Sequence, residues 1–257
     1  MLLAVDVGNS HTVLGLFRET LLVTHWRIRT ESAITADELA STLQTLFTIE
    51  HVTFAEVTDM VIASVVPQIL AVWHALAKIR FSLTPLDIDH QTTGGMKVLI
   101  DNPAEVGADR LVNAIAAYTQ YSLPLIIVDF GTAITLDCVS EQGDYLGGVI
   151  APGSSIAMEA LGRRTAKLPR VDISIPPNQV IGKNTVDAIK SGILFGFGGL
   201  VETLIQQIKQ EMAPAEPKVI ATGGMAHLIS PYAPSIEAID PMLTLTGLRL
   251  LHERNHP

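Results

Sequence analysis

The sequence predicts an α/β protein built from two domains of similar topology. Short apolar segments typical of buried strands alternate with longer segments whose apolar residues recur at helical spacing. One unit, an apolar strand followed by Asp-x-Gly and a returning apolar strand, occurs at Asp6 and again at Asp129. A chain of 257 residues holds one large domain or two of ordinary size, and the repeat favours two.

The elements of the first half begin with a strand at 2–5 and its return at 13–17, because apolar runs flank the turn formers of 6–10. A third strand is expected at 21–28. Thr35 with Glu38 is a helix N-terminal pattern, so a helix is expected from Thr35 to about Phe47. Further expectations are a strand at 60–66, helices at 69–79 and 111–121, strands at 125–128, 134–139 and 219–222, a glycine-rich turn at 147–148 and a helix at about 184–210.

Composition limits the classes of function. Hydrophobic residues make up 48% of the chain, which excludes a disordered protein. The net charge of −9 argues against a nucleic-acid partner, which a basic surface would have to attract. An anionic ligand would therefore be met by metal ions and backbone N–H groups. Cys138 is the only cysteine, so the chain forms no internal disulfide and no cysteine metal cluster.

Nothing in the sequence predicts a membrane partner. Two uncharged stretches, 60–77 and 111–128, reach the length of a span, but Pro67 and Pro124 interrupt them. The N-terminus enters an apolar strand without a basic region or a cleavage site. The sequence therefore predicts a cytoplasmic protein.

The Asp-x-Gly hairpins are the strongest functional signal. Glycine allows a tight turn whose N–H groups surround an anion, and the adjacent carboxylate can hold hydrated Mg²⁺. A single copy at 6–12 is better explained as an ordinary hairpin turn. Two copies favour one hairpin for phosphates and the other for a cation or the terminal phosphoryl group.

Other motifs leave alternatives open. Thr222-Gly223-Gly224 is either a surface for a flat base or a turn that needs positive φ. Asp109 is either a first-turn carboxylate stabilised by the helix dipole or a general base beside Arg110. Glycines within the long helix are more simply explained by close packing against a neighbour or a second subunit. They are Gly192, Gly196, Gly198 and Gly199.

Three familiar sequence motifs, for zinc catalysis, P-loop and Rossmann nucleotide binding, do not indicate the function of this chain. His252-Glu253-Arg254-Asn255-His256 matches the H-E-x-x-H zinc pattern, but its second histidine is the penultimate residue, where chains fray. The chain contains no G-x-x-x-x-G-K-[ST], and no G-x-G-x-x-G follows a strand. Zinc catalysis, P-loop and Rossmann interpretations are therefore disfavoured.

The ordered set of motifs resembles the type III pantothenate kinases, a family of the acetate and sugar kinase, heat-shock 70 and actin superfamily. The motifs that carry this resemblance are the segments 6–12, 101–103, 107–110, 129–132, 147–153, 165–169, 182–185 and 222–224. The resemblance implies an α/β fold of two ribonuclease-H-like (actin-like ATPase) domains with a central cleft. We expect these domains at 1–118 and 119–257.

The resemblance also implies ATP-dependent phosphorylation of pantothenate, with Mg²⁺ and a monovalent cation, K⁺ or NH₄⁺, and a homodimer whose interface helps form the pantothenate site. Asp109 would accept the proton, and Asp129 would bind the monovalent cation. The residues implied to bind ATP are Asp6, Val7, Gly8, Asn9, Ser10, His11, Thr12, Val13 and Thr132. Those implied to bind pantothenate are Gly107, Ala108, Asp109, Arg110 and Thr185.

One position departs from the family. Ile100 stands where tyrosine is common and contacts substrate, so either pantothenate binds more weakly or van der Waals contact suffices. Two other functions stay open: a nucleotide-sensing regulator without kinase activity, and a kinase for another small alcohol or carboxylate. The set of Asp6, Asp109 and Asp129 counts against the regulator, since a sensor needs no general base.

Overall fold

The computed structural model describes residues 1–164, 169 and 171–256, so most of the motif at 165–169 lies outside the described residues. The chain forms two compact units. The first comprises 1–97, 101–116 and 243–257, and the second comprises 98–100 and 117–242. The expected boundary at 118/119 falls close to the division at 116/117, but 243–257 joins the first unit rather than the second.

The first unit is a mixed five-stranded sheet of order β3-β2-β1-β4-β5. β1 pairs antiparallel with β2 and parallel with β4, so the predicted strand–turn–strand unit is a hairpin beside a parallel strand. The strands are β1 Leu2–Val7, β2 His11–Arg18, β3 Leu21–Arg29, β4 Asp59–Ser64 and β5 Leu86–Ile88. The helices are α1 Ala36–Ile49, α2 Pro67–Leu76 and α7 Leu243–Asn255, with short helical turns at Phe54–Glu56, Ala77–Phe81 and Pro103–Glu105.

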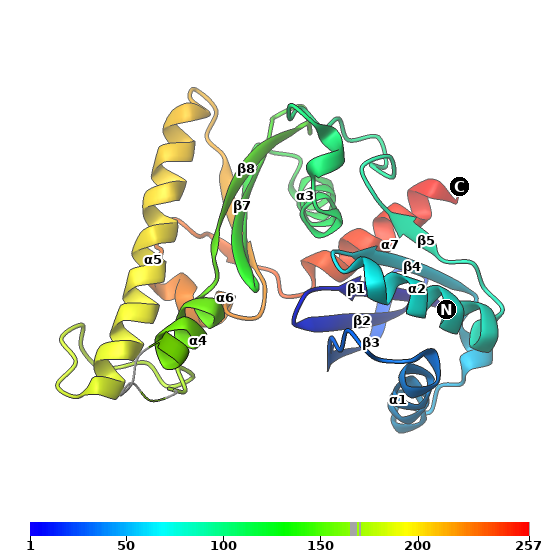
Figure 1. Ribbon diagram of the computed structural model, residues 1–257. Coiled ribbons are helices and arrows are strands. Elements are labelled where there is room, and N and C mark those ends of the chain that lie inside the picture. Colours follow the sequence, from blue (N-terminus) through cyan, green and yellow to red (C-terminus); the bar gives the residue numbers. More distant parts are fainter. Residues whose placement is uncertain (165–168, 170, 257) are drawn as a thin grey trace. The chain divides into compact units, whose positions relative to one another are not determined.

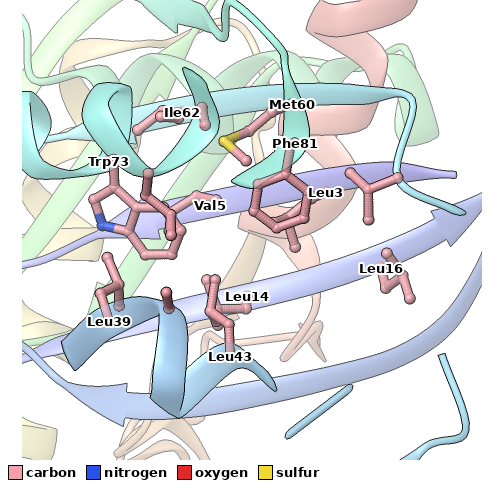
Figure 2. Close-up of a cluster of buried hydrophobic side chains, with 14 of the residues drawn as sticks. Leu3, Val5, Leu14, Leu16, Leu39, Leu43, Met60, Ile62, Trp73 and Phe81 are labelled. Carbon is pink, nitrogen blue, oxygen red and sulfur yellow. The ribbon is translucent and has the colours of Figure 1, made fainter. Parts of the chain in front are cut away.

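One face of this sheet forms the core of the first unit with α1 and α2. Strand residues alternate between faces, so Leu3 and Val5 of β1 point to the same side as Leu14 of β2. They meet α1 and α2 side chains such as Leu43 and the fully buried Trp73, as Figure 2 shows. α1 begins at a capping box in which Thr35 and Glu38 bond to each other's backbone N–H groups, as the sequence predicts.

The opposite face of the same sheet is covered by α7, a helix that the sequence did not predict. Leu245 lies where a side chain on Gly15 would be, and the Arg249 guanidinium is 5.9 Å from the centre of the Phe17 ring. Residues from the end of the sequence therefore complete the fold of the N-terminal sheet (Figure 1).

The second unit repeats the arrangement of the first with a sheet of order β10-β9-β6-β7-β8. β6 pairs antiparallel with β7 and parallel with β9, as β1 does with β2 and β4. The strands are β6 Leu125–Phe130, β7 Ala133–Val139, β8 Tyr145–Pro152, β9 Lys218–Thr222 and β10 Ala238–Ile239. The helices are α4 Ser154–Arg164, α5 Thr185–Glu211 and α6 Ala226–Ile229, and α3 Ala108–Tyr121 crosses the division between the units. The predicted α/β class with two similar domains is confirmed.

The turn expected at Gly147-Gly148 is wrong, because both residues lie inside β8. Gly147 has φ +117°, and the register between β7 and β8 shifts beside its partner Cys138. The glycine therefore marks an irregularity in a strand rather than its end.

Helix α5 packs on one face of the second sheet. By length and composition it is the one helix among the described residues that would suffice to cross a membrane, and 33% of its most apolar window is buried. Core helices of globular proteins meet the same criterion. Leu194, Val201 and Ile205 of α5 share a core with Ile126 and Val128 of β6, which accounts for the apolar character of this helix.

Candidate active site

The first Asp-x-Gly segment forms a tight turn whose backbone is fixed by hydrogen bonds within the turn and from Thr30, the residue after β3. The Gly8 N–H donates to the His11 carbonyl at 3.1 Å, and the Thr30 N–H at the end of β3 donates to the Ser10 carbonyl at 3.0 Å. The hydroxyls of Thr12 and Thr30 share a hydrogen bond of 2.9 Å. A side chain at position 8 would stand 3.0 Å from the His11 carbonyl oxygen, so the turn needs glycine. Such a braced turn with exposed backbone suits an anionic ligand.

Asp6 precedes this turn on the sheet face opposite the core. Its neighbours Val5 and Val7 are buried in the core with α1 and α2, so by alternation Asp6 faces the other side. That side carries α7. Asp6 is partly exposed, which leaves its carboxylate accessible to a hydrated cation beside the turn.

Asp109 lies in the first turn of α3, where the sequence placed it. Its Oδ1 accepts a hydrogen bond from the Arg110 N–H at 2.8 Å. A Cβ at Gly107 would be 2.5 Å from the same oxygen, so glycine makes room for the carboxylate. Burial raises the pKa of Asp109, and the Arg110 amide and guanidinium only partly oppose this rise. A carboxylate with raised proton affinity is suited to accept a proton.

Helix α7 connects the Asp109 helix to the Asp6 sheet. The Thr244 hydroxyl donates to Asn113 Oδ1 of α3 at 2.7 Å, and Gly247 lies against the Val112 carbonyl. The same helix places Leu245 against Gly15 of β2. Asp6 and Asp109 are therefore carried by elements that pack on one helix within the first unit.

The second Asp-x-Gly segment is enclosed by two glycine-containing segments. Asp129 pairs across the sheet with Thr222, and the turn after Thr222 brings Gly223 against Asp129 Oδ1 with φ +92°. The positive-φ interpretation of this turn is confirmed. The Gly153 N–H donates to the Thr132 carbonyl at 3.1 Å, and no side chain fits at position 153. Asp129 and Thr132 are thus held in one preformed loop cluster.

Thr185 does not lie with Asp129. It is the first residue of α5, next to the cap in which the Asp187 N–H donates to Asn184 Oδ1 at 2.8 Å. Phe130 packs in the α5 core, so Asp129, its neighbour on β6, faces away from α5. Thr185 instead helps line a mostly apolar cavity of about 490 Å³ with residues of α4 and α5. Its other lining residues are Leu161, Ala188, Ile189, Gly192 and Ile193.

Ile100 belongs to a short segment that extends the second sheet. Val98 forms a parallel bridge with Tyr145, and the Leu99 N–H donates to the Tyr145 carbonyl at 2.8 Å. A Cβ at Gly147 would lie 3.4 Å from Ile100, so these two residues are neighbours. Tyr145 is itself anchored, because its buried hydroxyl donates to Asp137 Oδ1 at 2.6 Å. The sequence alone did not predict this pair, although an aspartate within an apolar strand, Asp137, was the available signal.

The described residues contain no group of three His, Cys, Asp or Glu side chains placed to hold a metal ion. The His252 and His256 rings stack with centres 4.5 Å apart, but within the described part of the chain no third ligand completes a zinc site with them. A divalent ion would therefore be held by single carboxylates, by water and by ligand oxygens. A cavity of about 730 Å³ near the loop 213–217 contains none of the expected site residues.

Comparisons with known proteins show the family and the fold of the chain. A family model described as type III pantothenate kinase matches residues 2–207. A type III pantothenate kinase of Geobacter sp. strain M21 is 49% identical over 255 residues, covering 99% of this chain and all of the relative. One from Pelobacter propionicus is 48% identical over the same length.

Solved structures extend the similarity at the level of the fold. Component A of (R)-2-hydroxyglutaryl-CoA dehydratase from Acidaminococcus fermentans aligns with a TM-score of 0.58 at 11% identity, covering 99% of this chain and 97% of that one. An archaeal actin homologue aligns with a TM-score of 0.58 at 13% identity, covering 98% and 99%. The expected ribonuclease-H-like class is confirmed by these neighbours, and the full-length similarity to its relatives shows that the chain belongs to the type III pantothenate kinase family.

Proposed function

We propose that this enzyme transfers the γ-phosphoryl group of ATP to the terminal hydroxyl of pantothenate, the first step of coenzyme A biosynthesis, with Asp109 as the proton acceptor. Membership of the family supports the reaction. The observation that supports the role of Asp109 is its partly buried carboxylate of raised pKa, for which Gly107 leaves room.

The hairpin from Asp6 to Val13 binds the phosphates of ATP. The exposed turn at Asn9 and Ser10 presents its backbone to the phosphates, and Asp6 beside it holds hydrated Mg²⁺. Mg²⁺, when bound, neutralises charge on the phosphate oxygens. This matters because the protein carries a net charge of −9 and would otherwise repel ATP.

Asp109 orients the attacking hydroxyl and takes its proton late in the reaction. Phosphoryl transfer through a loose transition state requires mainly positioning and charge neutralisation, so the alcohol needs no prior ionisation. A carboxylate buried at the start of α3 is a better acceptor than one in water, because its charged form is less favoured. Gly107, Ala108 and Arg110 bind pantothenate around it.

Asp129 binds the monovalent cation, K⁺ or NH₄⁺, and Thr132 contacts ATP. The support is that Gly223 and Gly153 leave space for the Asp129 carboxylate and the Thr132 carbonyl. An ion at this position adds a positive charge near the nucleotide, where the chain itself has few cations.

The enzyme works as a homodimer in the cytoplasm, and Thr185 of the partner subunit completes each pantothenate site. Thr185 begins a helix that packs on the sheet face away from Asp129, which supports its use by a second copy. α5 also exposes Gly192, Gly196 and Gly199, and a Cβ at any of them would meet nothing within 4 Å. Another subunit can approach such a surface closely.

Mixing two inactive variants tests this arrangement. In a mixed dimer, one subunit carries Asp109→Asn and the other carries Thr185→Ala. If Thr185 serves the partner's site, one of the two sites in this dimer contains both native residues. The mixture is then expected to turn over faster than either variant alone. If Thr185 serves its own subunit, no native site forms and the mixture stays at the average of the two.

An ADP-release assay, with and without pantothenate and with K⁺ replaced by Na⁺, tests the function itself. We expect ADP release that requires pantothenate and is faster in K⁺. Release without pantothenate, or none at all, would favour the nucleotide-sensing regulator. Faster release with another small alcohol or carboxylate would favour a related kinase.

A further inference from the structure

Strand β3, at the edge of the first sheet, places two arginines on the same face as Asp6. Trp26 and Ile28 of β3 pack against the core on the α1 and α2 side. Their neighbours Arg27 and Arg29 therefore project to the opposite face. Asp6 lies on that opposite face as well, because its own neighbours are buried in the same core.

The register places Arg27 in the row of Asp6. Asp6 pairs with Val13 of β2, and Val13 pairs with Arg27 of β3. Residues directly opposite each other in neighbouring strands share a face, and strands are about 4.8 Å apart. The Cα of Arg27 is thus about 10 Å from that of Asp6, with only Val13 between them. An extended arginine side chain can cross Val13 toward the Gly8–Ser10 turn.

Arg27 is exposed, and its guanidinium forms no ion pair or hydrogen bond with the part of the chain that the structure describes. Other arginines of the first unit are engaged: Arg80 pairs with Asp37 at 2.7 Å, and Arg29 lies 3.8 Å from Glu31. An unpaired guanidinium beside a phosphate-binding turn is available for an anion. Its planar group donates two parallel hydrogen bonds to phosphate oxygens.

We propose that Arg27 binds the terminal phosphates of ATP from the edge of the sheet, opposite Asp6 and its Mg²⁺. The inference rests on the proposed function. Asp6 and Arg27 then form the two sides of a phosphate site whose floor is Val13 and whose end is the hairpin turn.

Calorimetric titration of MgATP and AMP into three variants of the full chain tests the proposal. Arg27→Gln is expected to raise the Kd for ATP about tenfold, the order expected for one lost charge-assisted hydrogen bond, and to leave AMP binding unchanged. Arg27→Lys keeps the charge and is expected to lose less. Arg18→Gln is the matched control, because Arg18 is an exposed arginine at the far end of the same sheet.

Equal ATP affinities for Arg27→Gln and Arg18→Gln would overturn the proposal. The arginines of β3 would then be explained as charges that prevent another chain from pairing with this edge strand. An equal loss for ATP and AMP would also overturn it, since a terminal-phosphate contact distinguishes the two. Failure of the unmodified protein to bind ATP would instead refute the proposed function. Unchanged thermal unfolding of Arg27→Gln confirms that the altered affinity is local.

Discussion

Asp109→Asn is expected to lower kcat at least about 100-fold, the lower range for losing a general base. The amide keeps the shape of the side chain and its place in the first turn of α3, but it cannot accept the proton of the pantothenate hydroxyl. Binding of ATP should be unchanged, because the phosphates meet the Asp6 hairpin. Steady-state kinetics with a separate ATP titration measures both quantities.

The same variant is expected to be more stable than the native enzyme at neutral pH. Burial raises the pKa of Asp109 in the folded state, so the ionised carboxyl opposes folding. The native protein loses stability as the pH rises through the folded-state pKa, and the loss is absent below the unfolded value of about 3.9. The advantage of the asparagine variant in the free energy of unfolding should therefore grow as the pH is raised above about 3.9, until Asp109 is fully ionised in the folded state.

Asp37→Asn is the matched control, since Asp37 is likewise the second residue of its helix and lies in the same unit. Asp37 is exposed and paired with Arg80, so this variant should change stability little and turnover not at all. Undiminished turnover in Asp109→Asn would refute the assignment of the base. A drop of similar size in both variants would point to a general effect of charge.

Gly223→Ala is expected to destabilise the second unit and, if Asp129 binds the cation as proposed, to impair cation binding as well. Gly223 has φ +92°, where a residue with a Cβ costs about 1–3 kcal/mol in backbone strain alone. The added methyl would also overlap Asp129 Oδ1 and the Phe130 backbone. Urea unfolding should show the loss of stability, and half-maximal activity should need more K⁺ because Asp129 is displaced.

Gly131→Ala is a control that separates the effect of backbone strain from the effect of a methyl group close to Asp129. Gly131 also lies beside Asp129, but a Cβ there would stand 3.5 Å from Asp129 Oδ1 and 3.3 Å from the Ala133 carbonyl. Its effect on stability should be the smaller of the two. A Gly223→Ala enzyme with native stability and native K⁺ dependence would show that this turn does not position Asp129.

The sequence predicted well the local structure around the candidate site residues, which short-range chemistry determines. The hairpins at Asp6 and Asp129 end in Asp-x-Gly, and their strands are apolar, so turn preference and burial agree. Asp109 was placed correctly because its helix starts directly after Gly107. Whether that carboxylate is a base or a helix-dipole partner was not decidable, since its burial depends on long-range packing.

The errors and omissions arise where distant segments decide the structure. Gly147 was assigned to a turn, but pairing with β7 and a shifted register keep it in a strand. α7 was missed because Thr244 and Gly247 interrupt its leucines and weaken the helical pattern in the sequence. The helix is stabilised by packing against the first sheet, which the local sequence does not show. The proposed role of Arg27 was missed for a related reason. Alternation along β3 separates its side chains into two faces, but only the pairing of the strands shows which of these faces also holds Asp6.

The return of α7 to the N-terminal sheet sets an order for biosynthesis on the ribosome. The unit that carries Asp6 and Asp109 lacks α7 until residues 243–255 have emerged, whereas the unit with Asp129 has all of its residues once 242 has emerged. The nascent chain must therefore keep the face around Gly15 from aggregating while a later segment folds ahead of it.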